Sequence, residues 1–164
     1  MKAKTYYRWA VAALLVALLI APGTIAAKAT RTECAGTEVR VEVLDGGLWT
    51  YPDGNIHVRG MVSLYQEEST CPEVGGFVTS TMNANWDSSL VGPMWGTARS
   101  ENEKGVWEGT WQGNIGPDGA CSYQAISHGV SGAVTGLKMT LIADCTDPDV
   151  TTFTATILDP QGGE

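Results

Sequence analysis

After an apolar N-terminal segment, apolar and polar residues alternate along most of the chain. No window of useful length carries apolar residues at helical spacing, and Gly, Pro, Asp and Asn interrupt the alternation at intervals. The pattern therefore predicts an all-β protein. Eight strands are expected, near residues 37–44, 55–66, 76–86, 93–101, 105–114, 120–128, 137–145 and 151–158.

Short turn sequences separate the expected strands. Residues 51–55 read YPDGN and residues 116–120 read GPDGA, which puts proline early in a turn and glycine where a positive φ is needed. Such short connections favour antiparallel pairing of consecutive strands, and closure into a barrel removes the exposed edges of the sheet. We predict a single antiparallel eight-stranded up-and-down β-barrel.

The hairpin over residues 93–113 indicates which residues face inward. Aligned through its ENEK connection, it sets Ser100 against Gly105 and Ala98 against Trp107, and directly opposed residues share a face. A slip of one residue would mix apolar and polar side chains on each face. The expected core face consists of Met94, Gly96, Ala98, Trp107, Gly109 and Trp111.

Four cysteines follow residue 27, and none belongs to a C-x-x-C pair, which weakens both a zinc-site and a thiol-redox interpretation. Spacing alone leaves three disulfide connectivities open. If Cys121 opposes Cys145 in the hairpin over 120–145, its two faces separate cleanly into apolar and polar, while Cys34 and Cys71 flank the first hairpin. We therefore predict the disulfides Cys34–Cys71 and Cys121–Cys145.

Extending the alternation to the other strands completes the expected interior, which contains no ionisable side chain. The further inward residues are Val39, Val41, Val43, Val58, Val62, Leu64, Val78, Met82, Ala84, Trp86, Phe153, Ala155 and Ile157. The side chains expected to line the interior around any ligand are Trp86, Met94, Trp107, Trp111, Tyr123 and Met139.

The N-terminus reads as a secretory signal peptide. Lys2, Lys4 and Arg8 precede the apolar run at 10–21, and small residues follow Pro22-Gly23. We expect cleavage after Ala27, with Ala29 as the alternative, leaving one β-barrel domain over residues 28–164. The apolar run is shorter than the roughly 20 residues of a membrane-spanning helix, so no membrane insertion is expected after cleavage. Localisation is expected to be secreted, periplasmic or at the cell surface.

Charge narrows the possible partners. The formal net charge is −8, and removal of residues 1–27, which hold three basic and no acidic residues, makes it −11. An acidic surface repels phosphate backbones and anionic membranes, so no nucleic-acid partner is expected. Oligomeric state stays open.

Candidate catalytic and metal-binding residues are few. His57 and His128 fall on the polar sides of their strands, with no nucleophile assigned to either. Asp144, Asp147 and Asp149 could offer oxygen ligands to calcium, but their spacing fits no defined calcium loop. We expect no catalytic residue, no metal and no cofactor.

Two further features leave alternatives open. Another register of strand 76–86 would turn Asn83 and Asn85 inward as a polar ligand site. Trp49 and Trp95 are the most exposed aromatic candidates for stacking on a sugar, although such platforms need polar partners on the same surface.

The run SHGVSGAVTGLKMTLIADC at 127–145, after GVWEGTWQG at 105–113, resembles the glycine-punctuated hairpins of allene oxide cyclase and dirigent-like barrels and of uncharacterised secreted bacterial β-barrels. The resemblance implies a calycin-like eight-stranded barrel that holds a hydrophobic small molecule. Their catalytic residues match no positions here. The G-x-W at Gly105 and at Gly109 is also similar to the lipocalin and avidin signature, which in those families lies on the first strand.

The expected function is that of a secreted, disulfide-bonded, non-enzymatic barrel. It would bind a lipophilic small molecule or serve a structural or interaction role at the cell surface. A barrel enzyme of the cyclase or isomerase kind would instead show a cavity with at least two convergent polar groups. A carbohydrate-binding module would show an exposed row of aromatic rings.

Overall fold

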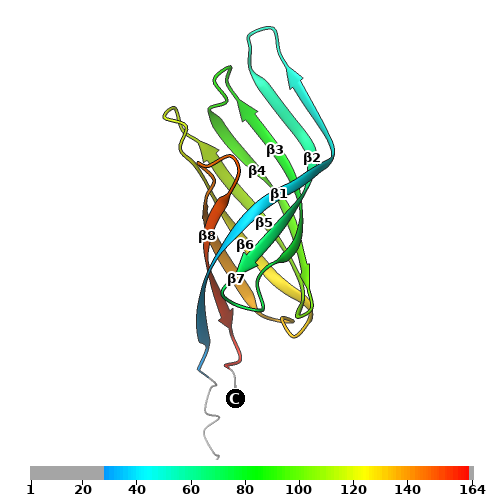
Figure 1. Ribbon diagram of the computed structural model, residues 1–164, viewed down its shortest axis with the longest axis vertical. Helices are drawn as coiled ribbons and strands as arrows, with labels where there is room; N and C mark the ends of the chain where they lie inside the picture. The colour runs from blue at the N-terminus through cyan, green and yellow to red at the C-terminus, as the bar shows by residue number, and fades with distance from the viewer. Residues whose placement is uncertain (1–27, 163–164) are drawn as a thin grey trace, which may run out of the picture.

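The computed structural model describes residues 28–162, which form eight strands in one closed antiparallel barrel (Figure 1). Each strand pairs with its neighbours in chain order, and β1 pairs with β8 to close the ring. The predicted signal peptide at residues 1–27 lies outside the described part of the chain. The strands are β1 Thr30–Thr50, β2 Ile56–Ser69, β3 Gly76–Trp86, β4 Gly92–Asn102, β5 Gly105–Ile115, β6 Cys121–Gly132, β7 Lys138–Asp144 and β8 Thr151–Asp159.

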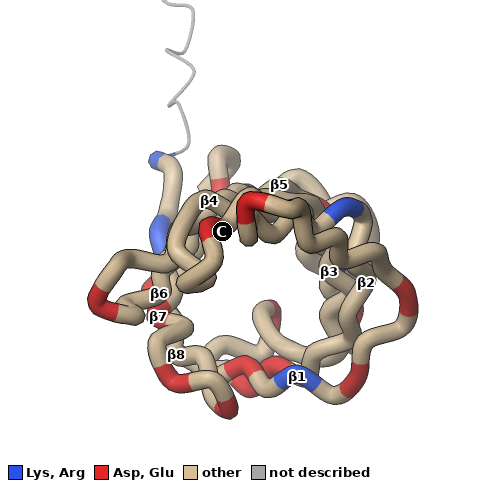
Figure 2. The backbone as a smooth tube through the Cα atoms, turned by 90° about the horizontal axis from the view of Figure 1, so that it is seen from above, with Lys and Arg blue, Asp and Glu red and all other residues tan. Residues whose placement is uncertain are grey.

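The prediction of an all-β, eight-stranded up-and-down barrel is confirmed. Viewed from above, the backbone forms a complete ring, and acidic residues are spread around it (Figure 2). Between residues 28 and 162 the chain has no helix that is long and apolar enough to cross a membrane.

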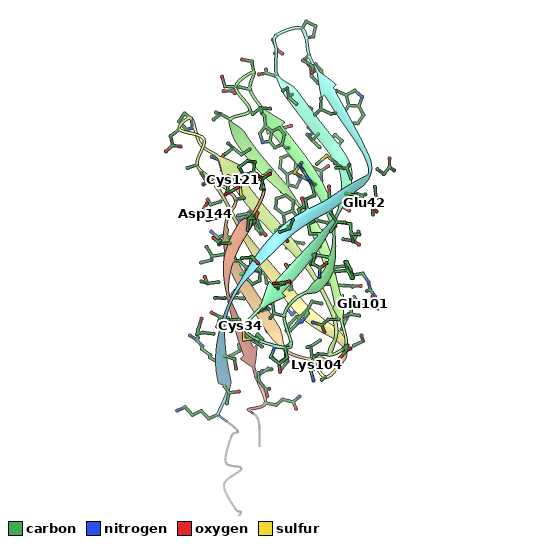
Figure 3. The ribbon with its side chains drawn as sticks, in the orientation of Figure 1. Cys34, Glu42, Glu101, Lys104, Cys121 and Asp144 are labelled. Atoms are coloured by element: carbon green, nitrogen blue, oxygen red, sulfur yellow. A yellow bond between two sulfur atoms is a disulfide. The ribbon has the colours of Figure 1, made fainter. Side chains whose placement is uncertain are left out.

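Disulfides fasten both ends of the barrel (Figure 3). Cys34 of β1 is bonded to Cys71 in the β2–β3 connection, and Cys121 of β6 is bonded to Cys145 just after β7. Both predicted pairings are therefore present. Because consecutive strands alternate in direction, the β2–β3, β4–β5 and β6–β7 connections lie at one end of the barrel, which we call the Cys34 end. The remaining four connections lie at the opposite end, which we call the Cys121 end.

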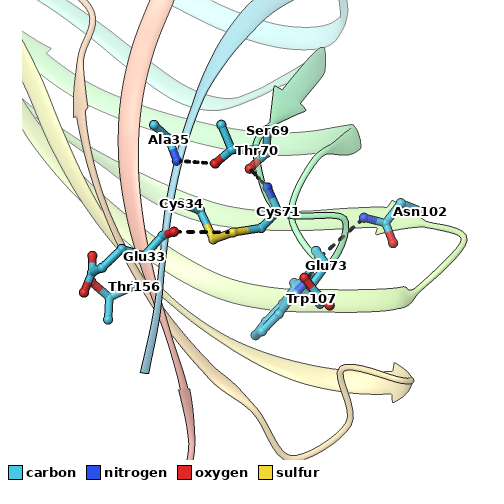
Figure 4. Close-up of a disulfide and its surroundings, with 10 residues drawn as sticks. All are labelled: Glu33, Cys34, Ala35, Ser69, Thr70, Cys71, Glu73, Asn102, Trp107 and Thr156. Atoms are coloured by element: carbon cyan, nitrogen blue, oxygen red, sulfur yellow. Dashed lines mark hydrogen bonds between the residues drawn. A yellow bond between two sulfur atoms is a disulfide. The ribbon is translucent and has the colours of Figure 1, made fainter. Parts of the chain in front are cut away.

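At the Cys34 end, the β2–β3 connection lies beside Trp107 (Figure 4). The indole Nε1 of Trp107 donates a hydrogen bond of 2.8 Å to the carbonyl oxygen of Glu73 in the β2–β3 connection. Val74 from the same connection and Val134 from the β6–β7 connection are buried beside Trp107 in the main core. A second, smaller core of Val58, Ala84 and Met94 lies elsewhere in the barrel.

The β4–β5 hairpin has the predicted inner face but a different register. Ser100 opposes Trp107 and Gly96 opposes Trp111, so the pairing is displaced by two residues from the expected one. Asn102 opposes Gly105 across a tighter turn, in which the Asn102 side chain accepts a 2.8 Å hydrogen bond from the amide of Lys104. A two-residue displacement keeps each side chain on its face, since the side-chain period of a strand is two.

A bulge in β2 overturns the predicted orientation of Val62 and Leu64. The ladder with β3 shifts between Val58 and Met61, where Gly60 has a φ of +63°. One extra residue in a strand inverts the faces that follow it. Val58 stays inside as predicted, but Leu64 opposes the exposed Thr79 on the outer face.

The predicted inward set on β1 is also wrong. Val39, Val41 and Val43 are 44–53% exposed, whereas Glu38 is only 9% exposed. Cys34 turns inward to reach Cys71, and Gly36 lies against the Phe153 ring, where a side chain would collide with it. Alternation from Cys34 therefore puts Glu38 inside the barrel.

On β3 and β8, the predicted inward orientation is confirmed for five residues: Val78, Ala84, Phe153, Ala155 and Ile157.

Candidate functional site

An interior cavity of about 170 Å³ is lined by side chains from both cores, including Trp107 and Met139 from one and Met94 from the other. Trp111 and Tyr123 also line it. Five of the six side chains expected around a ligand thus meet in one cavity. Its walls are mainly apolar, as is usual for sites that bind small molecules.

Trp86, the sixth expected residue, does not line the cavity. It packs against the small core around Val58, and its buried indole Nε1 has no hydrogen-bond partner among the described residues. Its place near the β3–β4 connection puts it toward the Cys121 end.

Two glutamates share the cavity wall, contrary to the prediction of an interior without ionisable groups. Glu38 of β1 and Glu67 of β2 oppose one another in the β1–β2 ladder, and each is 9% exposed. Tyr123 of β6 donates a 3.2 Å hydrogen bond from its hydroxyl to Oε1 of Glu38. These three side chains lie together in a mainly apolar site, and we call them the acidic cluster.

Burial governs the protonation of the acidic cluster. It raises the pKa of Glu67 to about 8, and the facing charge of Glu38 and their mutual hydrogen bond add to that rise. Burial also raises the pKa of Glu38, against the hydrogen bonds from Tyr123 and Glu67. The pKa of Tyr123 is raised by burial and by both carboxylates, so its hydroxyl stays a donor. The pair of carboxyls therefore retains a proton at neutral pH.

An aromatic group from β5 and a hydroxyl group from β3 lie next to the acidic cluster. The rings of Trp111 and Tyr123 lie 5.7 Å apart at a tilt of 59°. Trp111 donates from Nε1 to the Ser80 hydroxyl at 3.0 Å. Both indoles that line the cavity thus have their N–H groups engaged by protein, which leaves their apolar surfaces for a guest.

The cavity reaches the point where the barrel wall divides. Glu38 and Thr151 form one terminal pair of the β1–β8 ladder, and both line the cavity. Beyond Glu38, β1 continues to Thr50 paired only with β2 among the described residues, and Figure 1 shows it leaving β8. The acidic cluster accordingly lies at the division between β1 and β8.

Neither His57 nor His128 is among the described residues that line the cavity. His128 is exposed, and the His57 ring packs against Tyr51 at a tilt of 56°, with ring centroids 4.5 Å apart. Asn83 and Asn85 support the bulge: Asn83 accepts a 3.1 Å hydrogen bond from the amide of Gly60, and Asn85 accepts one from Arg59. Their amides thus serve the β2–β3 ladder and do not line the cavity.

The aspartates at the end of β7 and just after it accept hydrogen bonds from backbone amides. Asp144 accepts a 2.9 Å hydrogen bond from Thr146, and Asp147 accepts one of the same length from Asp149. Within residues 28–162, no three His, Cys, Asp or Glu side chains gather where they could hold a metal ion.

The two tryptophans considered for sugar stacking lie on different strands. Trp49 of β1 is 51% exposed near the β1–β2 turn, and Trp95 of β4 is 38% exposed. Trp95 borders an outer hollow with Gln112 and Gln124, but the Arg59 guanidinium lies 5.7 Å from its ring centroid. That contact competes with a sugar for the ring.

Sequence reasoning missed the acidic cluster because it followed hydrophobicity along β1. The valines at alternate positions favour one face, whereas the buried Cys34 of the structure favours the other. Counting by two from an inward Cys34 identifies Glu38 as an inward residue, but the strand expected over 37–44 does not include Cys34. Glu67 follows from the bulge, which the sequence marks only by Gly60.

Comparison with protein-family models, with curated proteins and with solved structures finds no match to this chain.

Proposed function

We propose that this protein is an exported, disulfide-bonded barrel that binds a small, largely apolar molecule in its interior cavity. The cavity carries the proposal: it has a volume of about 170 Å³ and a mainly apolar lining to which Trp, Met and Ala side chains contribute. An apolar cavity of about 150 Å³ in a protein core is enough to bind benzene. The expected guest is therefore about the size of one aromatic ring with a short substituent.

Two features that indicate export from the cytoplasm support the same proposal. Two disulfides are typical of proteins from oxidising, extracytoplasmic environments. The apolar segment at 10–21 with its basic flank provides a route of export. A barrel with a purely structural role would have its interior filled by its own tryptophans and methionines.

Binding of benzyl alcohol, followed by ligand-detected saturation-transfer NMR, tests this function. The wild-type protein is expected to bind, whereas Ala98→Phe puts a ring into the cavity and is expected to block binding. Ala35→Phe is the matched control, because Ala35 is exposed on β1. Absence of wild-type binding, or equal binding by Ala98→Phe, would overturn the proposal.

A second candidate function is proton-transfer catalysis of the isomerase kind, which the acidic cluster favours. Carboxyls with raised pKa values inside an apolar site suit general acid–base chemistry. A small ketone such as acetophenone, incubated with the protein in D₂O, would then lose its methyl protons to deuterium faster than without protein. An unchanged exchange rate, or equal rates for wild type and Glu38→Gln, rejects this candidate.

A further inference from the structure

The charge on the cavity wall restricts the class of guest. Glu38 and Glu67 are both buried, and among the described residues none that lines the cavity is Lys, Arg or His. Both groups are acids, so any negative charge that the pair carries has no basic partner among the described residues of the cavity lining. A buried charge without a partner of opposite sign is unfavourable, so the site lacks a positive group.

The charges and titratable groups around the pair do not supply one. Tyr65 on β2 and Tyr123 on β6 face it with neutral hydroxyls whose pKa values burial raises. Arg40 opposes Tyr65 in the β1–β2 ladder, but it is exposed and its charge acts on Tyr65. Thr151 of β8, the ladder partner of Glu38, is uncharged.

The rest of the cavity lining is mainly apolar, so it fits the uncharged part of a guest that carries a positive group. Glu38 and Glu67 come from β1 and β2, whereas Met94, Trp107 and Trp111 come from β4 and β5. A molecule with a cationic head and an apolar body would satisfy both sides at once. Aromatic rings add cation–π attraction to a positive group held beside them.

Long-range electrostatics favour the same charge. The chain carries a formal net charge of −8, and an acidic protein concentrates cations near its surface while it repels anions. An anionic guest such as a fatty acid would also oppose Glu38 and Glu67 directly.

Resting on the proposed function, we infer that the guest is a small lipophilic ammonium: an organic amine, protonated at neutral pH, with one ring-sized apolar group. Its N–H groups donate to the carboxyls of Glu38 and Glu67, and its apolar group lies among the cavity tryptophans and methionines. The ammonium supplies the positive charge that the described cavity lining lacks.

Isothermal titration of the wild-type protein with three ligands of one shape tests the inference: benzylamine, benzyl alcohol and benzoate. At neutral pH, benzylamine is expected to bind at least tenfold more tightly than benzyl alcohol, and benzoate more weakly than either. Equal affinities for the amine and the alcohol would overturn the ammonium assignment while leaving the proposed function intact. Failure of all three to bind would overturn both.

Substitutions of the two glutamates test whether they cause the preference for benzylamine over benzyl alcohol. The double variant Glu38→Gln with Glu67→Gln keeps the shape of both side chains, and it is expected to reduce benzylamine affinity to that of benzyl alcohol. Glu68→Gln, at the exposed neighbour of Glu67, is the matched control and is expected to change neither affinity. A preference for benzylamine that survives the double variant contradicts the inference. The wild-type series decides the matter even if the double variant fails to fold.

Discussion

Glu38 and Glu67 oppose one another across the β1–β2 ladder, and both carboxyls line the interior cavity. Directly opposed like charges destabilise a sheet, and burial increases the cost. The pair meets this cost in part by holding a proton and in part through the hydroxyl of Tyr123. Stability given up at such a position is typical of binding and catalytic sites.

Glu67→Gln is expected to remove a pH-dependent loss of stability. Glu67 has a pKa near its ordinary value of 4.5 when unfolded and about 8 when folded. Between these values the folded state holds a proton that the unfolded state has lost, so stability falls as pH rises through the window. The slope is at most about 1.4 kcal/mol per pH unit.

Urea unfolding at about pH 5 and about pH 8 measures this effect. Wild type is expected to lose more stability than Glu67→Gln between the two conditions, and Glu68→Gln should behave as wild type. Identical pH slopes for wild type and Glu67→Gln would show that Glu67 is ionised in the folded protein.

Trp107→Ala is expected to reduce the free energy of unfolding by about 3–5 kcal/mol. Trp107 is 1% exposed, and its indole also holds the β2–β3 connection through the carbonyl of Glu73. Trp107→Phe should cost less, because it keeps a ring and leaves only that carbonyl without its donor. Denaturant unfolding measures both; a loss below about 1 kcal/mol for Trp107→Ala would place the ring outside the core.

Gly60→Ala tests the bulge in β2. Gly60 has a φ of +63°, and a Cβ there would meet open space, so the expected cost of about 1–2 kcal/mol is due to the backbone alone. Gly60→Asn should cost less, since Asn adopts this conformation more readily. Equal unfolding midpoints for wild type and Gly60→Ala would argue against a left-handed residue at this position.

The two disulfides are expected to differ in their effect on ligand binding. Removal of either, by Cys34→Ala with Cys71→Ala or by Cys121→Ala with Cys145→Ala, should cost about 3–4 kcal/mol of stability in the chain-entropy model. Cys121 and Cys145 line the cavity, so only their removal should alter the affinity for benzyl alcohol. Titration of both folded variants measures this; an effect confined to the Cys34–Cys71 variant would be inconsistent with the cavity.

Much of the fold could be predicted because alternation, turn residues and cysteine positions agree with one another. The faces of β4 and β5 follow from large residues beside small ones, but their register depends on the length of the turn after Asn102, which the pattern does not determine. The polar residues of the site could not be predicted in the same way, because they lie where the simple alternation of inward apolar and outward polar residues does not hold. A bulge at Gly60 inverts β2, and Cys34 overrides three valines to turn Glu38 inward.

The central claim is that a small apolar molecule occupies the barrel interior, and contacts between ligand and methionine methyl groups test it most directly. Met82, Met94 and Met139 line the cavity, whereas Met61 packs beside the smaller core outside the lining. With ¹³C-methyl-labelled methionine and benzyl alcohol, we predict nuclear Overhauser effects from the ligand ring to at least one of the three lining methyls and none to Met61. Ring contacts to Met61 alone, or to no methionine while the ligand is bound, would contradict the claim.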